Sequence, residues 1–208
     1  MSINKMKILF AALLVSVVSG CANVSQDISS GSSSVSLKGL TQDKSKMPTL
    51  VYERKGAKPL SEYNSFIIDP IKVDYDGELS QEDLAELQQY FQKAMTDELT
   101  EAGYEVRTTP TPDTLRVSFR IFDIKTPTAL VNVTSLVVPG TSATVGEVSI
   151  EAVFSNAEMN QVDAVILEHS RGSYLFNANP YSNIDDIEYA FDNWARGFTR
   201  AVNTAKGK

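Results

Sequence analysis

The sequence predicts an α+β fold, an α/β sandwich in which two amphipathic helices pack on one face of a mainly antiparallel sheet. Two segments, 80–102 and 183–205, carry apolar residues at helical spacing. Between them, short segments alternate apolar and polar residues, as half-buried strands do. Because each helix has a single apolar stripe, both helices should cover the same face of the sheet, which leaves the other face polar and free.

The first predicted strand covers residues 66–73 and precedes the first helix. Its apolar density indicates burial on both faces, and Pro70 marks an edge or a bulge because proline cannot donate a ladder hydrogen bond. The helix that follows starts at a capping box of Ser80 and Asp83, and it ends before Gly103, which suits a C-terminal cap. Its apolar face consists of Leu84, Leu87, Phe91, Met95, Leu99 and Ala102.

Further strands are predicted at 104–107, 115–121, 146–154 and 164–176. The polar face of the second of these is basic, and that of the third is acidic. Opposite charges on neighbouring strands predict cross-strand ion pairs, each worth under about 1 kcal/mol when exposed. The expected pairs join Arg116 or Arg120 to Glu147 or Glu151.

The second helix closes the predicted domain. Acidic residues stand near its start, and Arg196 and Arg200 lie towards its end, as the helix dipole favours. Its apolar stripe is formed by Ile187, Ala190, Phe191, Trp194, Ala195, Phe198 and Val202. The uncharged segment 126–144, with many β-branched residues, has two interpretations: a hairpin that completes the core, or an exposed apolar surface for a partner.

The N-terminus predicts a secretory leader over residues 1–20. Lys5 and Lys7 precede an apolar stretch at 8–18, which is shorter than the roughly 20 apolar residues that a membrane span needs. The sequence Val18-Ser19-Gly20-Cys21 resembles the lipobox of bacterial lipoproteins. This resemblance implies cleavage before Cys21, a diacylglycerol on its thiol and an acyl chain on its new amine. Ala22, in place of an aspartate, favours the outer membrane.

The mature chain divides into three predicted parts. Residues 21–36 are a Ser-rich tether of low complexity, and residues 37–62 are an irregular arm that packs on the domain. Residues 63–208 form a single α+β domain. Because Cys21 is the only cysteine, no internal disulfide can form and the core alone must hold the fold.

The net charge excludes some classes of partner. The formal charge is -7, and loss of residues 1–20 removes two lysines and brings it to -9, with 17 basic residues against 26 acidic ones. Such a chain repels phosphate backbones, so nucleic-acid binding is not expected. The same charge argues against adhesion to anionic lipid headgroups.

Few residues suggest chemistry. One cysteine and one histidine exclude a zinc cluster of the usual kind, and no cofactor motif is present. A Ser-His-carboxylate site would need His169 with Ser149 or Ser170 as nucleophile, although we expect His169 to be a surface residue of a strand. Glu147 and Glu151, four residues apart on a strand, would lie about 13 Å apart, beyond the usual glycosidase spacing. Glu168 could approach Glu147 across a ladder.

A family resemblance covers the chain from about Gly39 to Val202. It is carried by the stretches 63–73, 115–117, 138–139, 146–152, 171–172 and 191–195, of which Gly146-Glu147-Val148-Ser149-Ile150-Glu151-Ala152 and Trp194-Ala195 are the most specific. On these residues the chain resembles a family of bacterial lipoproteins known as domain of unknown function 3313. It departs after Phe154, where the family has a short acidic turn that ends in Thr-Gly. The resemblance implies a lipoprotein and carries no activity.

These observations lead to an expected function with two alternatives. We expect a non-catalytic lipoprotein of the outer membrane that faces the periplasm and assists another envelope protein; a surface-exposed orientation stays open. The alternatives are an accessory that binds lipid or another apolar ligand through residues 130–138, and a cell-wall or glycan hydrolase. A binding pocket, if present, is expected near Glu147, Glu151 and Arg171.

Overall fold

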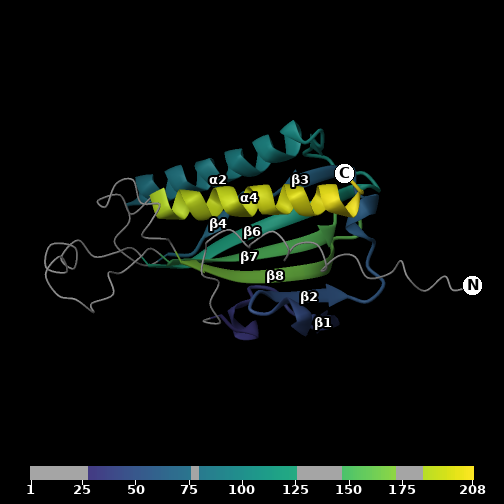
Figure 1. The fold of residues 1–208 in the computed structure, drawn as a ribbon, viewed down its shortest axis with the longest axis horizontal. Coiled ribbons are helices and arrows are strands. Elements are labelled where there is room, and N and C mark those ends of the chain that lie inside the picture. Colours follow the sequence, from purple (N-terminus) through teal and green to yellow (C-terminus); the bar gives the residue numbers. More distant parts are fainter. Residues whose placement is uncertain (1–27, 76–79, 126–146, 172–184) are drawn as a thin grey trace, which may run out of the picture.

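The computed structural model describes residues 28–75, 80–125, 147–171 and 185–208. These residues form a layer of two helices on one face of a sheet (Figure 1). The predicted α+β class is therefore confirmed. The predicted hairpin or partner surface at 126–144, the end of the strand predicted at 164–176 and the proposed lipid contact at 130–138 lie outside the described residues.

The described part of the sheet has eight strands in the order β1-β2-β8-β7-β6-β3-β5, with β4 also paired to β6. The neighbours from β1 to β6 are antiparallel, whereas β3 pairs with β5 and β6, and β4 with β6, in parallel. The sheet is thus mainly antiparallel, as predicted. The strands are β1 (Leu40–Gln42), β2 (Leu50–Arg54), β3 (Ser65–Ile68), β4 (Lys72–Val73), β5 (Glu105–Val106), β6 (Thr114–Lys125), β7 (Glu147–Asn156) and β8 (Gln161–Arg171).

Helices α2 (Gln81–Glu101) and α4 (Asp185–Ala205) lie side by side on the same face of the sheet (Figure 1). The predicted capping box is present, because the Ser80 side chain accepts from the Asp83 backbone and the Asp83 carboxylate accepts from the Ser80 backbone. The helices and the sheet enclose the main apolar core. Neither described helix is long and apolar enough to cross a membrane.

Pro70 divides the first predicted strand into β3 and β4. Both pieces pair with β6, but Ser65 lies opposite Thr114 and Lys72 opposite Arg120, so the register shifts by one residue between them. The extra residue is the irregularity that the proline predicts.

The stretch predicted as an irregular arm, 37–62, instead extends the sheet. Its strand β2 pairs with β8, and β1 pairs with β2 as the outermost strand. The two faces of β2 are both buried, because Val51 joins the core under the helices while Leu50 and Tyr52 face the other way. The prediction failed because β2 is a short strand that is stabilised by pairing with the distant β8, and its own sequence does not indicate that pairing.

The face of the sheet opposite the helices is not free, which corrects the prediction. It carries a second apolar cluster, formed by Ile28, Leu50, Tyr52, Val153, Val165 and Leu167, and Val35, Leu37 and Leu40 pack against it. Residues 28–36, which we call the docked segment, lie across this face. The prediction of a free tether as far as residue 36 is therefore wrong for these residues, because their scattered apolar side chains pack against the sheet.

Candidate functional site

The polar residues of this second face gather around Glu151 of β7. Its side chain is fully buried, with none of its surface exposed. The Ser33 hydroxyl donates to Oε1 of Glu151 at 2.6 Å, and the Ser34 backbone N–H donates to the same oxygen at 2.9 Å. The Ser34 hydroxyl also donates to Oε2. The docked segment thus binds both oxygens of a single carboxylate.

Arg120 completes the cluster from the neighbouring strand. It lies opposite Glu151 in the β6–β7 register, and its Nε donates to Glu151 Oε2 at 2.8 Å. Its other guanidinium nitrogens donate to Asp74, at 3.1 Å, and to the Ser32 carbonyl. The guanidinium also lies 4.1 Å from the centre of the Phe122 ring. Arg120 therefore fixes both the carboxylate and the docked segment.

The predicted cross-strand pairing is confirmed for Arg120 and Glu151 and wrong for Arg116. Arg116 instead lies 3.9 Å from Asp69, which follows β3. The Arg120–Glu151 pair is buried rather than exposed, so the small energy expected for a surface pair does not apply. Loss of one partner of a buried pair leaves an uncompensated charge, which costs about 3–5 kcal/mol.

Two opposing effects set the pKa of Glu151. Burial raises it, but hydrogen bonds from Ser33, Ser34 and Arg120 together outweigh burial and bring the pKa below its usual value. The carboxylate is therefore ionised at neutral pH, and both of its oxygens accept hydrogen bonds from other groups of the protein. Glu151 therefore holds the docked segment on the sheet, and its oxygens are not available to a ligand.

A second polar group on this face links β7 to β8. Ser149 Oγ lies 2.8 Å from Nδ1 of His169, and Oε2 of Glu147 lies 3.8 Å from Nε2 of the same ring. The expectation of a surface histidine is wrong, because His169 and Ser149 are both completely buried. The pair has the residue types of a nucleophile and its base, but substrate has no access to it in this structure.

Glu168 lies on the opposite face of the sheet from Glu147. It pairs with Ile150 in the β7–β8 register, and its carboxylate accepts from the Trp194 indole N–H at 2.8 Å and from the Thr49 hydroxyl at 3.4 Å. Burial raises its pKa, and these two hydrogen bonds offset only part of the shift. The two carboxylates considered for a hydrolase therefore point to different sides.

The structure describes the side chains of Glu147 and Glu151, two of the three residues near which a binding pocket is predicted. The backbone register pairs Glu147 with Arg171, and both glutamates share a face with the docked segment. The side chain of Arg171 lies outside what the structure describes, so its role stays a prediction. The sequence did not predict a role for Ser33 and Ser34, because serine-rich composition is typical of linkers. The apolar Ile28, which packs on the same face of the sheet, was the one local indication that this segment is bound.

The groove between the two helices is the other candidate surface. It is lined by Tyr90, Lys93, Ala94, Asp97, Glu98, Glu101, Asp192 and Arg196. The Tyr90 hydroxyl donates to Asp192 at 3.0 Å and so ties α2 to α4 across the groove floor. Within the described ranges, no cluster of three histidine, cysteine, aspartate or glutamate side chains could hold a metal ion.

Comparison with protein families places this site in context. Residues 29–198 match the family described as "Protein of unknown function (DUF3313)". The chain belongs to this family. The match begins at the docked segment and ends within α4, so it includes the whole Glu151 cluster. No curated protein matches the chain.

Several solved structures are similar to the chain at low sequence identity. The PelC dodecamer from Paraburkholderia phytofirmans is 8% identical, with a TM-score of 0.44 over 72% of this chain and 96% of that one. A hypothetical protein from Chlamydia trachomatis is 13% identical, with a TM-score of 0.42 over 69% and 96%. A minor lipoprotein from Acinetobacter baumannii is 9% identical, with a TM-score of 0.37 over 69% and 94%.

Proposed function

We propose that the protein is a non-catalytic lipoprotein of the cell envelope, held on the outer membrane through lipid on Cys21 and facing the periplasm. The observation that carries this proposal is the docked segment. It starts seven residues after Cys21 and is fastened to the sheet by buried Glu151. An anchored chain of this kind holds the domain at the membrane. Each buried CH₂ of its lipid contributes about 0.8 kcal/mol, so two or three chains make release slow.

The chemistry of the buried polar residues supports a non-catalytic role. Glu151 is saturated by donors of the protein, and Glu168 is buried against Trp194 on the other face. Ser149 and His169 bind each other in the interior. Each of these groups has a structural partner, which is the arrangement expected where polar residues hold a fold together.

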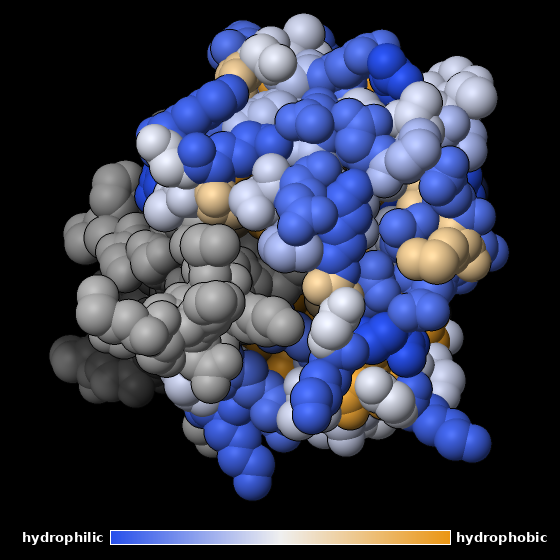
Figure 2. All heavy atoms as spheres, turned by 90° about the vertical axis from the view of Figure 1, so that its right-hand side faces the viewer, coloured by the Kyte–Doolittle hydropathy of each residue, from blue (hydrophilic) through white to orange (hydrophobic). Residues whose placement is uncertain are grey.

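We further propose that the helical layer binds a basic surface of another envelope protein. Helix α2 carries six acidic residues against one basic residue, and the groove between α2 and α4 is rimmed by carboxylates. Figure 2 shows one side of the molecule, where hydrophilic residues predominate and hydrophobic ones form small separate patches. The acidic residues of α2 and of the groove therefore favour a basic partner surface over an apolar one.

Crosslinking in intact cells tests the accessory role. A photoreactive amino acid at Gln89, an exposed position of α2, should give one discrete adduct. Glu98→Gln with Glu101→Gln, on the groove, should weaken that adduct at least severalfold. Glu62→Gln with Glu158→Gln removes the same charge at exposed sites outside α2 and α4 and should leave the adduct unchanged. An absent adduct, or equal loss in both variants, would contradict the proposal.

A further inference from the structure

The charge of the described structure is divided between two sides of the molecule. The helical layer is acidic, since α4 adds four acidic residues against two basic ones to the charge of α2. The β1–β2 hairpin, at the opposite end of the view in Figure 1, is rich in lysine instead. We call Lys38, Lys44, Lys46 and Lys55 the hairpin lysines.

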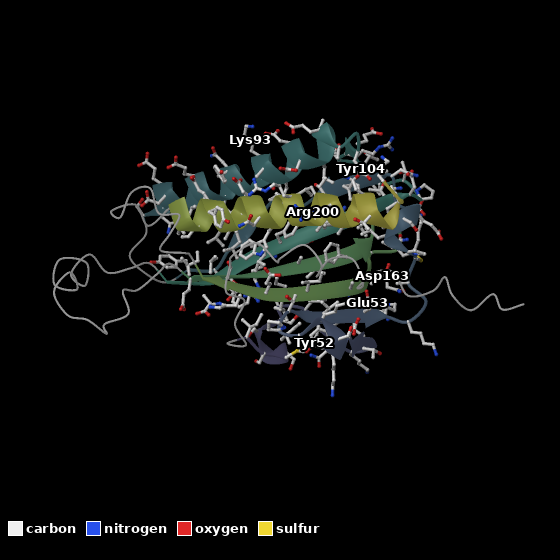
Figure 3. The ribbon with its side chains drawn as sticks, in the orientation of Figure 1. Tyr52, Glu53, Lys93, Tyr104, Asp163 and Arg200 are labelled. Carbon is white, nitrogen blue, oxygen red and sulfur yellow. The ribbon has the colours of Figure 1, made fainter. Side chains whose placement is uncertain are left out.

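The hairpin lysines flank the outermost strand at both of its ends. Lys38 precedes β1 and Lys55 follows β2, whereas Lys44 and Lys46 belong to the 3-10 turn η3 (Lys44–Lys46) between the strands. In Figure 3, long side chains that end in nitrogen extend from this hairpin away from the sheet, while the labelled Lys93 lies on the helical side. Together the hairpin lysines form a cationic edge on an acidic protein.

An exposed apolar side chain lies within this cationic edge. Met47 follows Lys46 directly and is 42% exposed, which makes it one of two large apolar side chains exposed in the described structure. A surface that joins lysines to an exposed apolar group suits the boundary of a bilayer. There the ammonium groups meet phosphates and the apolar group enters the headgroup region.

The start of the docked segment lies on the same side. Seven residues of chain reach at most about 25 Å, which limits the distance from Cys21 to Ile28. Ile28 packs with Leu50 and Tyr52 of β2, so the chain leaves the body beside the hairpin. A lipid on Cys21 therefore brings the hairpin side, and not the helices, close to the membrane.

We propose that the hairpin lysines and Met47 face the bilayer and bind anionic phospholipid headgroups, so that α2 and α4 point away from it. This orientation rests on the lipid anchoring proposed above. It leaves the acidic groove between the helices open to the compartment. Each lysine near an anionic surface should favour the oriented state by roughly fivefold at low salt.

Fluorescence quenching on vesicles tests the orientation. The lipidated full-length protein is bound to vesicles of phosphatidylcholine, with or without phosphatidylglycerol, that contain a lipid with a nitroxide on its headgroup. A fluorophore is attached to Thr41→Cys on β1 or to Gln89→Cys on α2, both exposed positions. Lipidation consumes the single native cysteine, so the introduced thiol alone is labelled. On anionic vesicles the β1 probe should be quenched more than the α2 probe, and high salt should reduce the difference.

Matched charge variants test whether the hairpin lysines cause the difference in quenching. Lys38→Gln, Lys44→Gln and Lys55→Gln together should reduce the difference between the probes on anionic vesicles to its value on vesicles without phosphatidylglycerol. The combination of Lys72→Gln, Lys93→Gln and Arg200→Gln changes the net charge equally and should preserve it. Equal quenching of the two probes on anionic vesicles would overturn the orientation. A difference on anionic vesicles that is unchanged in the hairpin variant would overturn the binding of headgroups by the lysines. Protein that fails to float with either kind of vesicle would overturn the anchoring itself, and the orientation with it.

Discussion

A buried carboxylate is tolerated only when other groups neutralise its charge and satisfy its oxygens, and Glu151 meets both conditions. Its partners come from two distant parts of the chain: Arg120 from the adjacent strand, and Ser33 and Ser34 from the docked segment. A single side chain therefore joins the N-terminal segment to the centre of the sheet. A residue that appeared in the sequence as a solvated charge is a structural one.

Glu151→Ala should lower the free energy of unfolding by about 3–5 kcal/mol, because the mostly buried Arg120 then keeps only the exposed Asp74 as a charged partner. Urea denaturation measures this loss. Glu86→Ala, at an exposed position of α2, is the control and should change stability by under about 0.5 kcal/mol. A loss below about 1 kcal/mol for Glu151→Ala would indicate that water solvates the cluster.

The stability contributed by the Glu151 cluster should also depend on pH. The pKa of Glu151 is lower in the folded protein than its usual value, so the native state binds its proton less readily. Its contribution is complete above the ordinary glutamate pKa and is lost as the pH falls through the lowered one. In acid, wild type and Glu151→Ala should therefore become closer in stability.

Glu168 should behave in the opposite way, with Trp194, the only tryptophan, as its reporter. Burial raises the Glu168 pKa, so stability is lost as the pH rises above the ordinary glutamate value of 4.5. Glu168→Gln should be more stable than wild type near neutrality and show no gain in acid. The Trp194 emission should titrate above pH 4.5 in wild type and stay constant in the variant. Identical titrations in the two proteins would refute the raised pKa.

At the scale of elements, local signals predicted the two helices well and the edges of the sheet poorly. The capping box at Ser80, the glycine after α2 and the apolar stripes are all encoded within a few residues. By contrast, β2 and the docked segment owe their places to β8 and β7, more than a hundred residues away. Serine-rich composition is typical of a linker, and the docked segment is bound only because Glu151 accepts hydrogen bonds from its serines.

The docked segment should be held by specific hydrogen bonds rather than by composition. Ser33→Ala with Ser34→Ala removes two donors to a charged acceptor, each worth about 1.5–3 kcal/mol. Hydrogen exchange of residues 28–36 should become at least tenfold faster, while that of α2 changes much less. Ser30→Ala, at an exposed position of the same segment, is the control. Unchanged exchange in the double variant would mean that apolar packing alone holds the segment.

For the whole molecule, the net charge did not predict how charges are distributed over the surface. A formal charge of -7 suggested repulsion from anionic lipids. The folded chain separates an acidic helical layer from a basic hairpin, and the hairpin lies beside the point where the docked segment begins. Such segregation depends on the order of strands in the sheet, which composition does not contain.

The proposed lipid on Cys21 holds a self-sufficient domain at the membrane. Mass spectrometry of the N-terminal peptide, together with membrane fractionation of wild type and Cys21→Ala, tests this anchoring. We predict a diacylglyceryl group on Cys21 of the wild type, and a Cys21→Ala protein that leaves the membrane fraction but keeps the same unfolding transition. A Cys21→Ala protein that stays with the membranes and still loses its leader would show that lipid on Cys21 is not the anchor.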